Sequence, residues 1–307
     1  MKKLIYILVY LCITIPAISQ SNIRLNNFWG NTNYINPASI YDKYKAVFSI
    51  AAQKQWAGIE GSPTTFFASG TTYLEKYHTQ LGASLVQSTL GYTSITNLNV
   101  AYAYALVLRD DWQVHMGLGG NYQSVAYDLS KVCLETDIDN IATQKLVAAG
   151  RFNVDLGAEL SNKTFKVGVA SQNLLSLFPS DIPLQTNTNF IYAKYHNETN
   201  GIASLGAGIC GIQYANLYQM EFNITGYFKN FQYNGLTDKP DLFDLGAFYR
   251  TGGEAGLIFG INISDAIHLS YTYDYHFGGI RYGSFGTNEL LITFNLRREP
   301  MCHNCWY

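Results

Sequence analysis

The sequence predicts an all-β fold, a transmembrane antiparallel β-barrel of the outer-membrane type with about 14 strands. Apolar or aromatic side chains alternate with small polar ones in runs of about ten residues, the length that a tilted strand needs to cross a bilayer. Only 14% of the 307 residues are charged, while tyrosine occurs 24 times and glycine 27 times. A typical soluble domain has about a quarter charged residues, whereas tyrosine and glycine suit strands, turns and membrane-interface girdles.

Residues 1–19 have the features of a secretory signal peptide. Lys2-Lys3 precede an almost wholly apolar run over residues 4–15. Ala17-Ile18-Ser19 then supplies the small residues that a signal peptidase requires, so we expect cleavage just before Gln20. The apolar run is too short for a transmembrane helix. The chain is therefore expected to be exported.

Residues 20–44 are rich in asparagine and show no sustained period. We expect an extended N-terminal segment that packs on, or plugs, the following structure; simple disorder is the alternative. Asn36, Pro37 and Ala38 close this segment, and Pro37 directs Asn36 to an extended or turn conformation.

Residues 45–297 form the predicted barrel, and the strand from Ile267 to Phe277 shows the alternation most clearly. Its polar positions are His268, Ser270, Thr272, Asp274 and His276. Successive side chains of a strand point to opposite faces, so the aromatic face, which includes Tyr273, is assigned to lipid and the polar face to the lumen. A secreted β-sandwich is the alternative, but its polar face would carry many lysines and glutamates.

Fourteen strand starts follow from this pattern. They are expected near Ala46, Thr64, Thr79, Ile95, Trp112, Gly150, Thr164, Thr188, Ile202, Leu217, Phe243, Glu254, Ile267 and Asn288. An even number places both termini in the periplasm, with short periplasmic turns and long external loops. The connection 230–242 is long where a short turn is expected, so it is either functional or a sign that the count is wrong by a pair. Residues 298–307 are predicted to be a periplasmic tail.

The candidate chemical motifs point to structure and not to catalysis. Gly206, Gly208 and Gly211 have the spacing of a dinucleotide-binding motif, but they do not open a helix within a βαβ unit. His268 and His276 are about 26 Å apart along an extended strand, so they cannot bind one metal ion. Together with Asp274 they are interpreted as solvated lumen residues.

The cysteines give no stronger signal. Cys302 and Cys305 resemble half of a zinc site without its second half, and a local disulfide or two free thiols is the favoured interpretation for an exported chain. No catalytic residue, metal or cofactor is predicted.

A tight loop is predicted after the first strand. Gln55 and Trp56 precede Gly58, Gly61 and Pro63, which are residues typical of turns. The loop is expected outside the membrane, while Asn36 to Ala38 are expected on the periplasmic side, so that the two segments mark opposite ends of the first strand.

These residues also carry a resemblance to a known family. Asn36-Pro37-Ala38, followed after a strand by Gln55-Trp56-x-Gly-x-x-Gly-x-Pro63, resembles the start of the PorP/SprF family. Near the C-terminus, Gly246 to Arg250, Tyr271 to Tyr275 (with Tyr273 and Asp274) and Gly286 to Leu290 are similar to family strands. The sequence departs from the family at Gln53 and Asn288, where Arg and His are common.

The resemblance implies an integral outer-membrane protein of the type IX secretion and gliding motility machinery. It implies non-catalytic assistance in the export or surface attachment of a large adhesin-like cargo. The implied partners are outer-membrane lipid, periplasmic secretion components and that cargo, and a net charge of −2 does not indicate nucleic-acid binding. The alternatives are a channel or transporter for small or hydrophobic solutes and a secreted adhesin.

Overall fold

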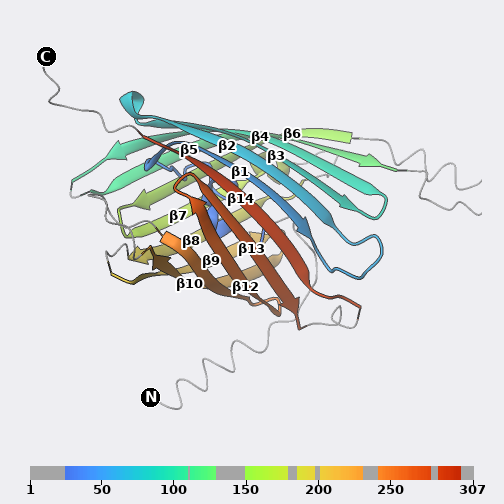
Figure 1. Cartoon of the computed structure of the whole chain (residues 1–307). Coiled ribbons are helices and arrows are strands. Elements are labelled where there is room, and N and C mark those ends of the chain that lie inside the picture. The colour runs from blue at the N-terminus through green and yellow to red at the C-terminus, as the bar shows by residue number, and fades with distance from the viewer. Residues whose placement is uncertain are drawn as a thin grey trace, which may run out of the picture.

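The computed structural model describes residues 25–109, 111–128, 149–178, 185–197, 201–230, 241–277 and 283–298. In these ranges fourteen antiparallel strands form one closed barrel, in which β1 pairs with β14 (Figure 1). The strands are β1 (Tyr44–Lys54), β2 (Thr64–Leu74), β3 (Thr79–Leu90), β4 (Thr93–Val107), β5 (Gln113–Tyr127), β6 (Ala149–Ser161), β7 (Phe165–Gln172), β8 (Thr188–Asn197), β9 (Ala203–Tyr214), β10 (Leu217–Lys229), β11 (Asp241–Arg250), β12 (Glu254–Ser264), β13 (Ile267–His276) and β14 (Thr287–Arg297). The predicted barrel and its strand number are confirmed, and closure removes the sandwich alternative.

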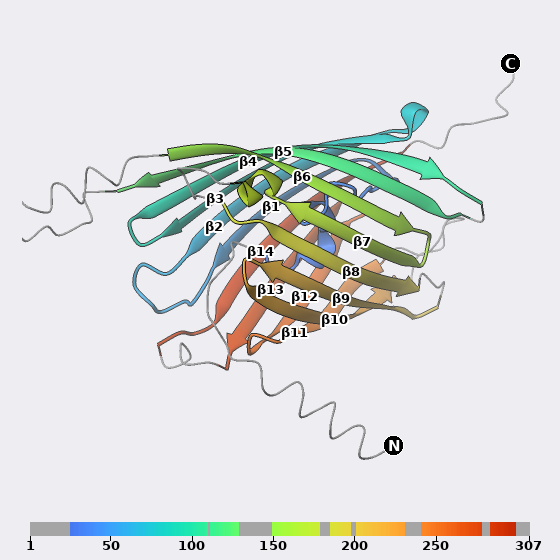
Figure 2. The ribbon, with the colours of Figure 1, turned by 180° about the vertical axis from the view of Figure 1, so that it is seen from behind.

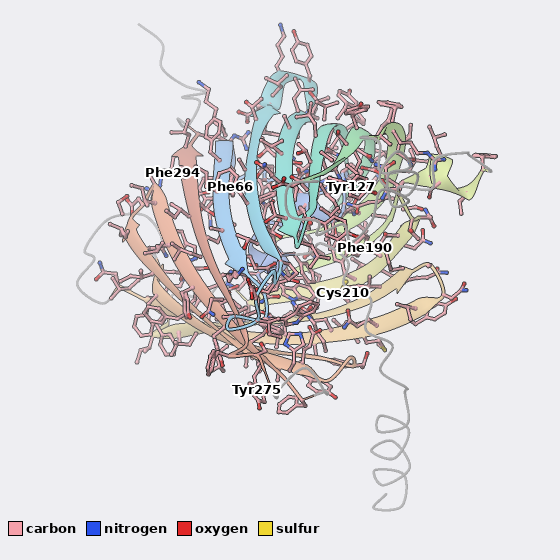
Figure 3. The ribbon with its side chains drawn as sticks, turned by 90° about the vertical axis from the view of Figure 1, so that its right-hand side faces the viewer. Phe66, Tyr127, Phe190, Cys210, Tyr275 and Phe294 are labelled. Atoms are coloured by element: carbon pink, nitrogen blue, oxygen red, sulfur yellow. The ribbon has the colours of Figure 1, made fainter. Side chains whose placement is uncertain are left out.

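The apolar and small polar residues that alternate in the sequence point alternately to the outside and the inside of the barrel wall. On β4, Leu98 and Tyr102 are 52% and 47% exposed, whereas Ala103 and Ala105 point inward and are buried. Figure 3 labels Phe66 and Phe294 from the outward set and Phe190 and Cys210 from the inward set. Every strand of the closed barrel pairs with a neighbour on both sides, which satisfies most of the backbone and lets an apolar exterior face lipid; β6 pairs with β7 only from Leu156 on.

The order of the strands shows which end of the barrel faces the periplasm and which faces the exterior. Since β1 begins and β14 ends at the same end, that end is assigned to the periplasm and the opposite one to the exterior. The connection between β10 and β11 lies at the periplasmic end, and with fourteen strands present its length does not come from a miscounted pair. Residues 231–240 of this connection lie outside the described residues. Among the described residues, no helix is long and apolar enough to span a membrane.

An arginine on the outer face should be costly. Ile224 lies in the middle of β10 opposite Ala207 and Ala247, and it is 53% exposed. We expect Ile224→Arg to lower the free energy of unfolding by about 2–4 kcal/mol, because a cation would lie in hydrocarbon. Ser84→Arg is the matched control, since Ser84 on β3 lines a cavity inside the lumen. Urea titrations of the protein folded in vesicles measure both costs, and equal costs would contradict the assignment of faces.

Candidate functional site

The lumen is filled by residues 25–43 of the chain itself. In Figures 1 and 2 the blue N-terminal segment is seen within the barrel. The expectation of an extended segment is wrong for this part, which forms the 3-10 turns η1 (Phe28–Gly30) and η2 (Thr32–Tyr34). Its backbone is shielded from bulk water, so it satisfies its own polar groups through turn bonds such as Asn31 N to Phe28 O at 2.9 Å.

Apolar side chains of this segment pack against the inner wall at three places. Phe28, Trp29 and Ile35 join a buried cluster with inward side chains of β7, β8 and β9. Leu25 packs in a second cluster with residues of β1, β2, β3 and β14, and Ile40 in a third with residues of β2 and β4. The segment is therefore packed like a protein core over its described length.

Glycines in the wall make room for the segment. A Cβ at Gly117 of β5 would collide with the backbone of Pro37 and Ala38, and one at Gly208 of β9 would collide with the ring of Trp29. Gly208 belongs to the glycine series with dinucleotide-motif spacing. Its place under Trp29 gives that glycine a packing role.

Near the external end, Arg250 of β11 lies at the centre of a buried charge cluster. Its Nε donates to Glu221 Oε2 at 2.5 Å, and its Nη1 to Glu254 Oε2 at 3.0 Å. Asp274 Oδ2 lies 3.7 Å from Nη1, and Nη1 also donates to Asn26 Oδ1 at 2.9 Å. We call Arg250, Glu221, Glu254 and Asp274 the external cluster, and Asn26 ties the N-terminal segment to it.

Glu289 of β14 extends this attachment. Its carboxylate accepts hydrogen bonds from the backbone N–H groups of Asn26 at 2.6 Å and Asn27 at 2.9 Å. Gln53 of β1 donates a third bond, at 2.9 Å. Glu289 is 1% exposed, so the carboxylate is held by hydrogen bonds and not by water. Gln53, at a position where the family often has arginine, thus has a defined role in this chain.

A second group of polar residues holds the later part of the segment near the periplasmic end. Glu159 of β6 accepts from Tyr192 Oη at 2.5 Å and lies 3.1 Å from His115 Nδ1 and 3.7 Å from Lys166 Nζ. Asn36 donates from Nδ2 to Tyr192 Oη at 3.0 Å. We call Glu159, His115, Lys166 and Tyr192 the periplasmic cluster.

Backbone carbonyls of the segment are satisfied by lysines from the wall. Lys166 Nζ donates to Ile40 O at 3.2 Å, and Lys194 Nζ donates to Trp29 O at 2.9 Å. With the two clusters, these bonds attach the segment to strands on opposite sides of the lumen.

The predicted lumen residues divide into two sites. His276 lies between Glu254 at 3.2 Å and Asp274 at 3.3 Å, next to the external cluster. His268 lies elsewhere, 3.0 Å from Asn262 Oδ1 and 3.6 Å from Asp244. The expectation that these residues are solvated is wrong for Asp274, which is 1% exposed, because the N-terminal segment covers it.

The loop after β1, near the N-terminus of the sequence, contacts residues near its C-terminus. Gln55 N donates to Pro63 O at 2.9 Å and closes the loop, in which Gly58 and Gly61 have φ values of 95° and 70° that favour glycine. The ring of Trp56 meets His276 edge to face, with centroids 6.3 Å apart.

The loop is also hydrogen-bonded to the connection before β14. Ala57 N donates to Gly286 O at 2.8 Å, and Phe285 N donates to Ala57 O at 2.7 Å. Tyr273 Oη donates to Phe285 O at 3.0 Å. Motif residues that are far apart in the sequence therefore meet at the external end.

Asn36, Pro37 and Ala38 lie apart from that loop. Asn36 and Ala38 are fully buried inside the barrel, and Ala38 N donates to Asn36 Oδ1 at 2.9 Å, a local turn that the sequence Asn-Pro favours. Gly117 and Gly157 next to them are on β5 and β6. The expectation that Asn36 to Ala38 mark the end of β1 is therefore wrong, because they pack inside the barrel on the periplasmic halves of β5 and β6.

Sequence reasoning missed the residues that hold the segment. Glu159 and Glu221 were not singled out, and Arg250 was named only as the end of a family-like strand, although each is a charged residue on the inward face of an alternating strand. Only 14% of the residues are charged, so a charged residue at an inward-facing position of a strand is unusual. This pattern could have identified the three residues from the sequence.

The described residues include neither a candidate metal site nor a pair of cysteines. Within them, no three His, Cys, Asp or Glu side chains come together as metal ligands. Cys210 is a buried thiol of β9, whereas Cys302 and Cys305 lie outside the described residues.

Removing the hydroxyl of Tyr192 should loosen the periplasmic cluster. Tyr192→Phe leaves both Asn36 Nδ2 and one Glu159 oxygen without this partner, so we expect the free energy of unfolding to fall by about 1–3 kcal/mol. Tyr102→Phe, on the exposed outer face of β4, should change it by less than about 0.5 kcal/mol. Chemical unfolding of the two variants in the same vesicles measures the difference, and similar values would contradict the role of the hydroxyl.

A closed fourteen-strand barrel with an apolar exterior and a polar, filled interior is an integral β-barrel protein of the outer membrane. The sequence matches the family described as type IX secretion system membrane protein PorP/SprF over residues 17–294. The chain belongs to this family, and it is an outer-membrane component of the type IX secretion system. No curated protein matches the sequence.

Solved outer-membrane proteins are similar in architecture only. The outer membrane protein Omp33 of Acinetobacter baumannii aligns with 13% identity and a TM-score of 0.48, covering 82% of this chain and 98% of its own. The toluene transporter TodX of P. putida aligns with 9% identity and a TM-score of 0.46, covering 86% and 93%. A FadL homologue of Pseudomonas aeruginosa has 11% identity and a TM-score of 0.44, covering 85% and 93%. Likenesses of this size say nothing about what this chain binds or transports.

Proposed function

We propose that this protein assists the export or surface attachment of a specific large adhesin-like cargo, and that it does so without catalysis. Family membership supports the secretion context. The observation that favours docking over transport is the filled lumen, in which most of residues 25–43 are buried and the segment is bonded to both walls. Such a barrel offers partners its two ends and its outer surface, and not an aqueous path.

The alternative is a channel or transporter for small or hydrophobic solutes. It would require the N-terminal segment to leave the lumen. If the segment left the lumen, Glu289 and Asn36 would lose their hydrogen-bond partners and the buried ring of Trp29 would be exposed. Because this is unfavourable, the structure argues against a permanently open path.

The two ends of the barrel suggest where the two kinds of partner bind. The turn η3 (Glu75–Tyr77) projects at the periplasmic end, and Tyr77 is 60% exposed. The loop around Trp56 lies at the external end. We assign periplasmic secretion components to the first end and the cargo to the second.

Site-specific photocrosslinking tests this assignment. A benzoylphenylalanine in place of Tyr77 should crosslink to periplasmic secretion components, and one in place of Tyr218, which is 72% exposed near the external end of β10, should not. A deletion strain should lose one large adhesin from its surface while other type IX cargo is still exported. Normal surface display of every cargo, with no secretion component crosslinked at Tyr77, would overturn the proposal.

A further inference from the structure

A polar cavity remains in the external half of the lumen. Its volume is about 190 Å³. Asn33 and Tyr34 of the N-terminal segment close it on the periplasmic side, and inward residues of β3, β4, β5 and β7 form much of its wall. Neither the external nor the periplasmic cluster contributes to it. Gln172 of the lining donates to Tyr34 O at 2.9 Å, but the carboxamides of β4 and β5 in the lining make no bond to the segment among the described contacts.

The lining is dominated by carboxamide side chains. They include Asn97, Asn99, Asn121, Gln123, Asn173 and Gln185. A carboxamide both donates and accepts hydrogen bonds, which is also what a hydroxyl group does. With Asn33 and Gln172 there are eight such groups around a small space, and they form a surface suited to a polyhydroxylated ligand.

The carboxylate in this lining already accepts three hydrogen bonds from the protein. Asp155 accepts from Asn99 Nδ2, Asn121 Nδ2 and the backbone N–H of Asn173, each at 2.8 Å. No lysine, arginine or histidine is among the described lining residues. The cavity therefore favours a neutral ligand over an anion.

Two buried acceptors of the cavity residues have no partner among the described residues. They are Asn97 Oδ1 and Asn173 Oδ1. A buried polar atom without a hydrogen bond is costly unless something donates to it, so a ligand with hydroxyl donors would stabilise both. Phe190 and Tyr214 add aromatic surface to the lining, which suits the apolar C–H face of a sugar ring.

The side wall next to the cavity is built differently from the rest of the barrel. β6 pairs with β7 only over Leu156–Ser161, and the turn η6 (Leu174–Leu177) lies beside the remainder of β6 (Figure 2). Leu175 is held there by Asn153, whose Oδ1 accepts from its N–H at 2.7 Å, and by Arg151, whose Nη2 donates to its carbonyl at 2.7 Å. The edge of β6 before Leu156 has no strand partner on this side among the described residues, and η6 is bonded to it through the side chains of Arg151 and Asn153.

We propose that this cavity binds a neutral carbohydrate, one hexose-sized ring at a time. Its volume lies below the roughly 300–1,000 Å³ of pockets for drug-sized ligands, which limits the ligand to about one ring. The ring is held by the carboxamides of β4 and β5 and lies against Phe190. This binding site does not depend on the cargo role proposed above.

The test uses the full mature protein in a detergent without a sugar headgroup, such as lauryldimethylamine oxide, because maltoside detergents carry the probe chemistry themselves. Saturation-transfer difference NMR is recorded with the methyl glycosides of glucose, galactose, mannose and N-acetylglucosamine. We expect transfer to at least one of them. Asn97→Leu and, independently, Gln123→Leu should each weaken its binding by about tenfold, the effect of losing one good hydrogen bond.

Asn223→Leu is the matched control. Asn223 lies on the inward face of β10, away from the cavity. Like Asn97 and Asn173 it has a buried side-chain atom, Nδ2, without a hydrogen bond among the described residues. This variant should bind the glycoside as the wild type does. Absence of transfer to all four glycosides, equal binding by all three variants, or transfer to N-acetyl-triglycine amide in place of the glycosides would overturn the proposal. Heat-modifiable gel migration verifies that each variant is folded.

Discussion

Replacing Arg250 with leucine should destabilise the folded barrel by about 3–5 kcal/mol, the largest effect that we expect of a single substitution. The guanidinium is 2% exposed and lies within ion-pair distance of Glu221, Glu254 and Asp274. Its removal leaves the buried carboxylates of Glu221 and Asp274 and the partly buried one of Glu254 close together, where like charges repel. It also removes the donor to Asn26 Oδ1, which weakens the attachment of the N-terminal segment, although the bonds from Asn26 and Asn27 to Glu289 remain. Urea unfolding in phospholipid vesicles, followed by heat-modifiable gel migration, measures the loss.

Arg297→Leu is the control for this prediction. Arg297 pairs with Asp265 at 3.1 Å, but the two side chains are 57% and 53% exposed. An exposed pair of this kind contributes about 0–1 kcal/mol. If Arg250→Leu cost no more than Arg297→Leu, the external cluster would not hold the fold as described.

Substituting Gly117 with alanine should displace the middle of the N-terminal segment from the inner face of β5, while the strands of the barrel stay folded. The added Cβ would collide with the backbone of Pro37 and Ala38, which cannot rotate away as a side chain can. We expect the segment to become accessible to protease added to detergent-solubilised protein, with cleavage at least about tenfold faster than in the wild type. That factor corresponds to about 1.4 kcal/mol, within the usual cost of overpacking.

Gly226→Ala controls for the loss of a strand glycine. Gly226 lies on β10, and its Cβ would meet the ring of Phe228 at an ordinary 3.5 Å. This variant should be cleaved at the wild-type rate. Equal protection of the segment in both variants would contradict the tight packing of Pro37 and Ala38 on β5.

The strands could be predicted from the sequence because their signal is local. A strand reverses the direction of its side chains at every residue, so the faces of β13 are readable from Ile267 to His276 alone. The number of strands and the inward direction of His268, Asp274 and His276 followed from the same period.

The filling of the lumen could not be derived in the same way. Asn26 and Glu289 are 263 positions apart in the chain, and the period of a strand carries no information about which segment meets its inner face. For the same reason Asp274 was expected to be solvated, although it is 1% exposed beneath the N-terminal segment. The turn conformation of residues 28–34 is likewise set by the wall around it, because tertiary packing overrides weak local preference.

The most direct test of the closed lumen is the electrical conductance of the wild-type protein in a planar lipid bilayer. Insertion is verified beforehand by flotation of the protein with vesicles. Because residues 25–43 are packed and bonded across the lumen, we predict no stable ohmic conductance step for the inserted wild-type barrel. A steady conductance of porin size in the wild type would contradict a lumen closed by its own N-terminal segment.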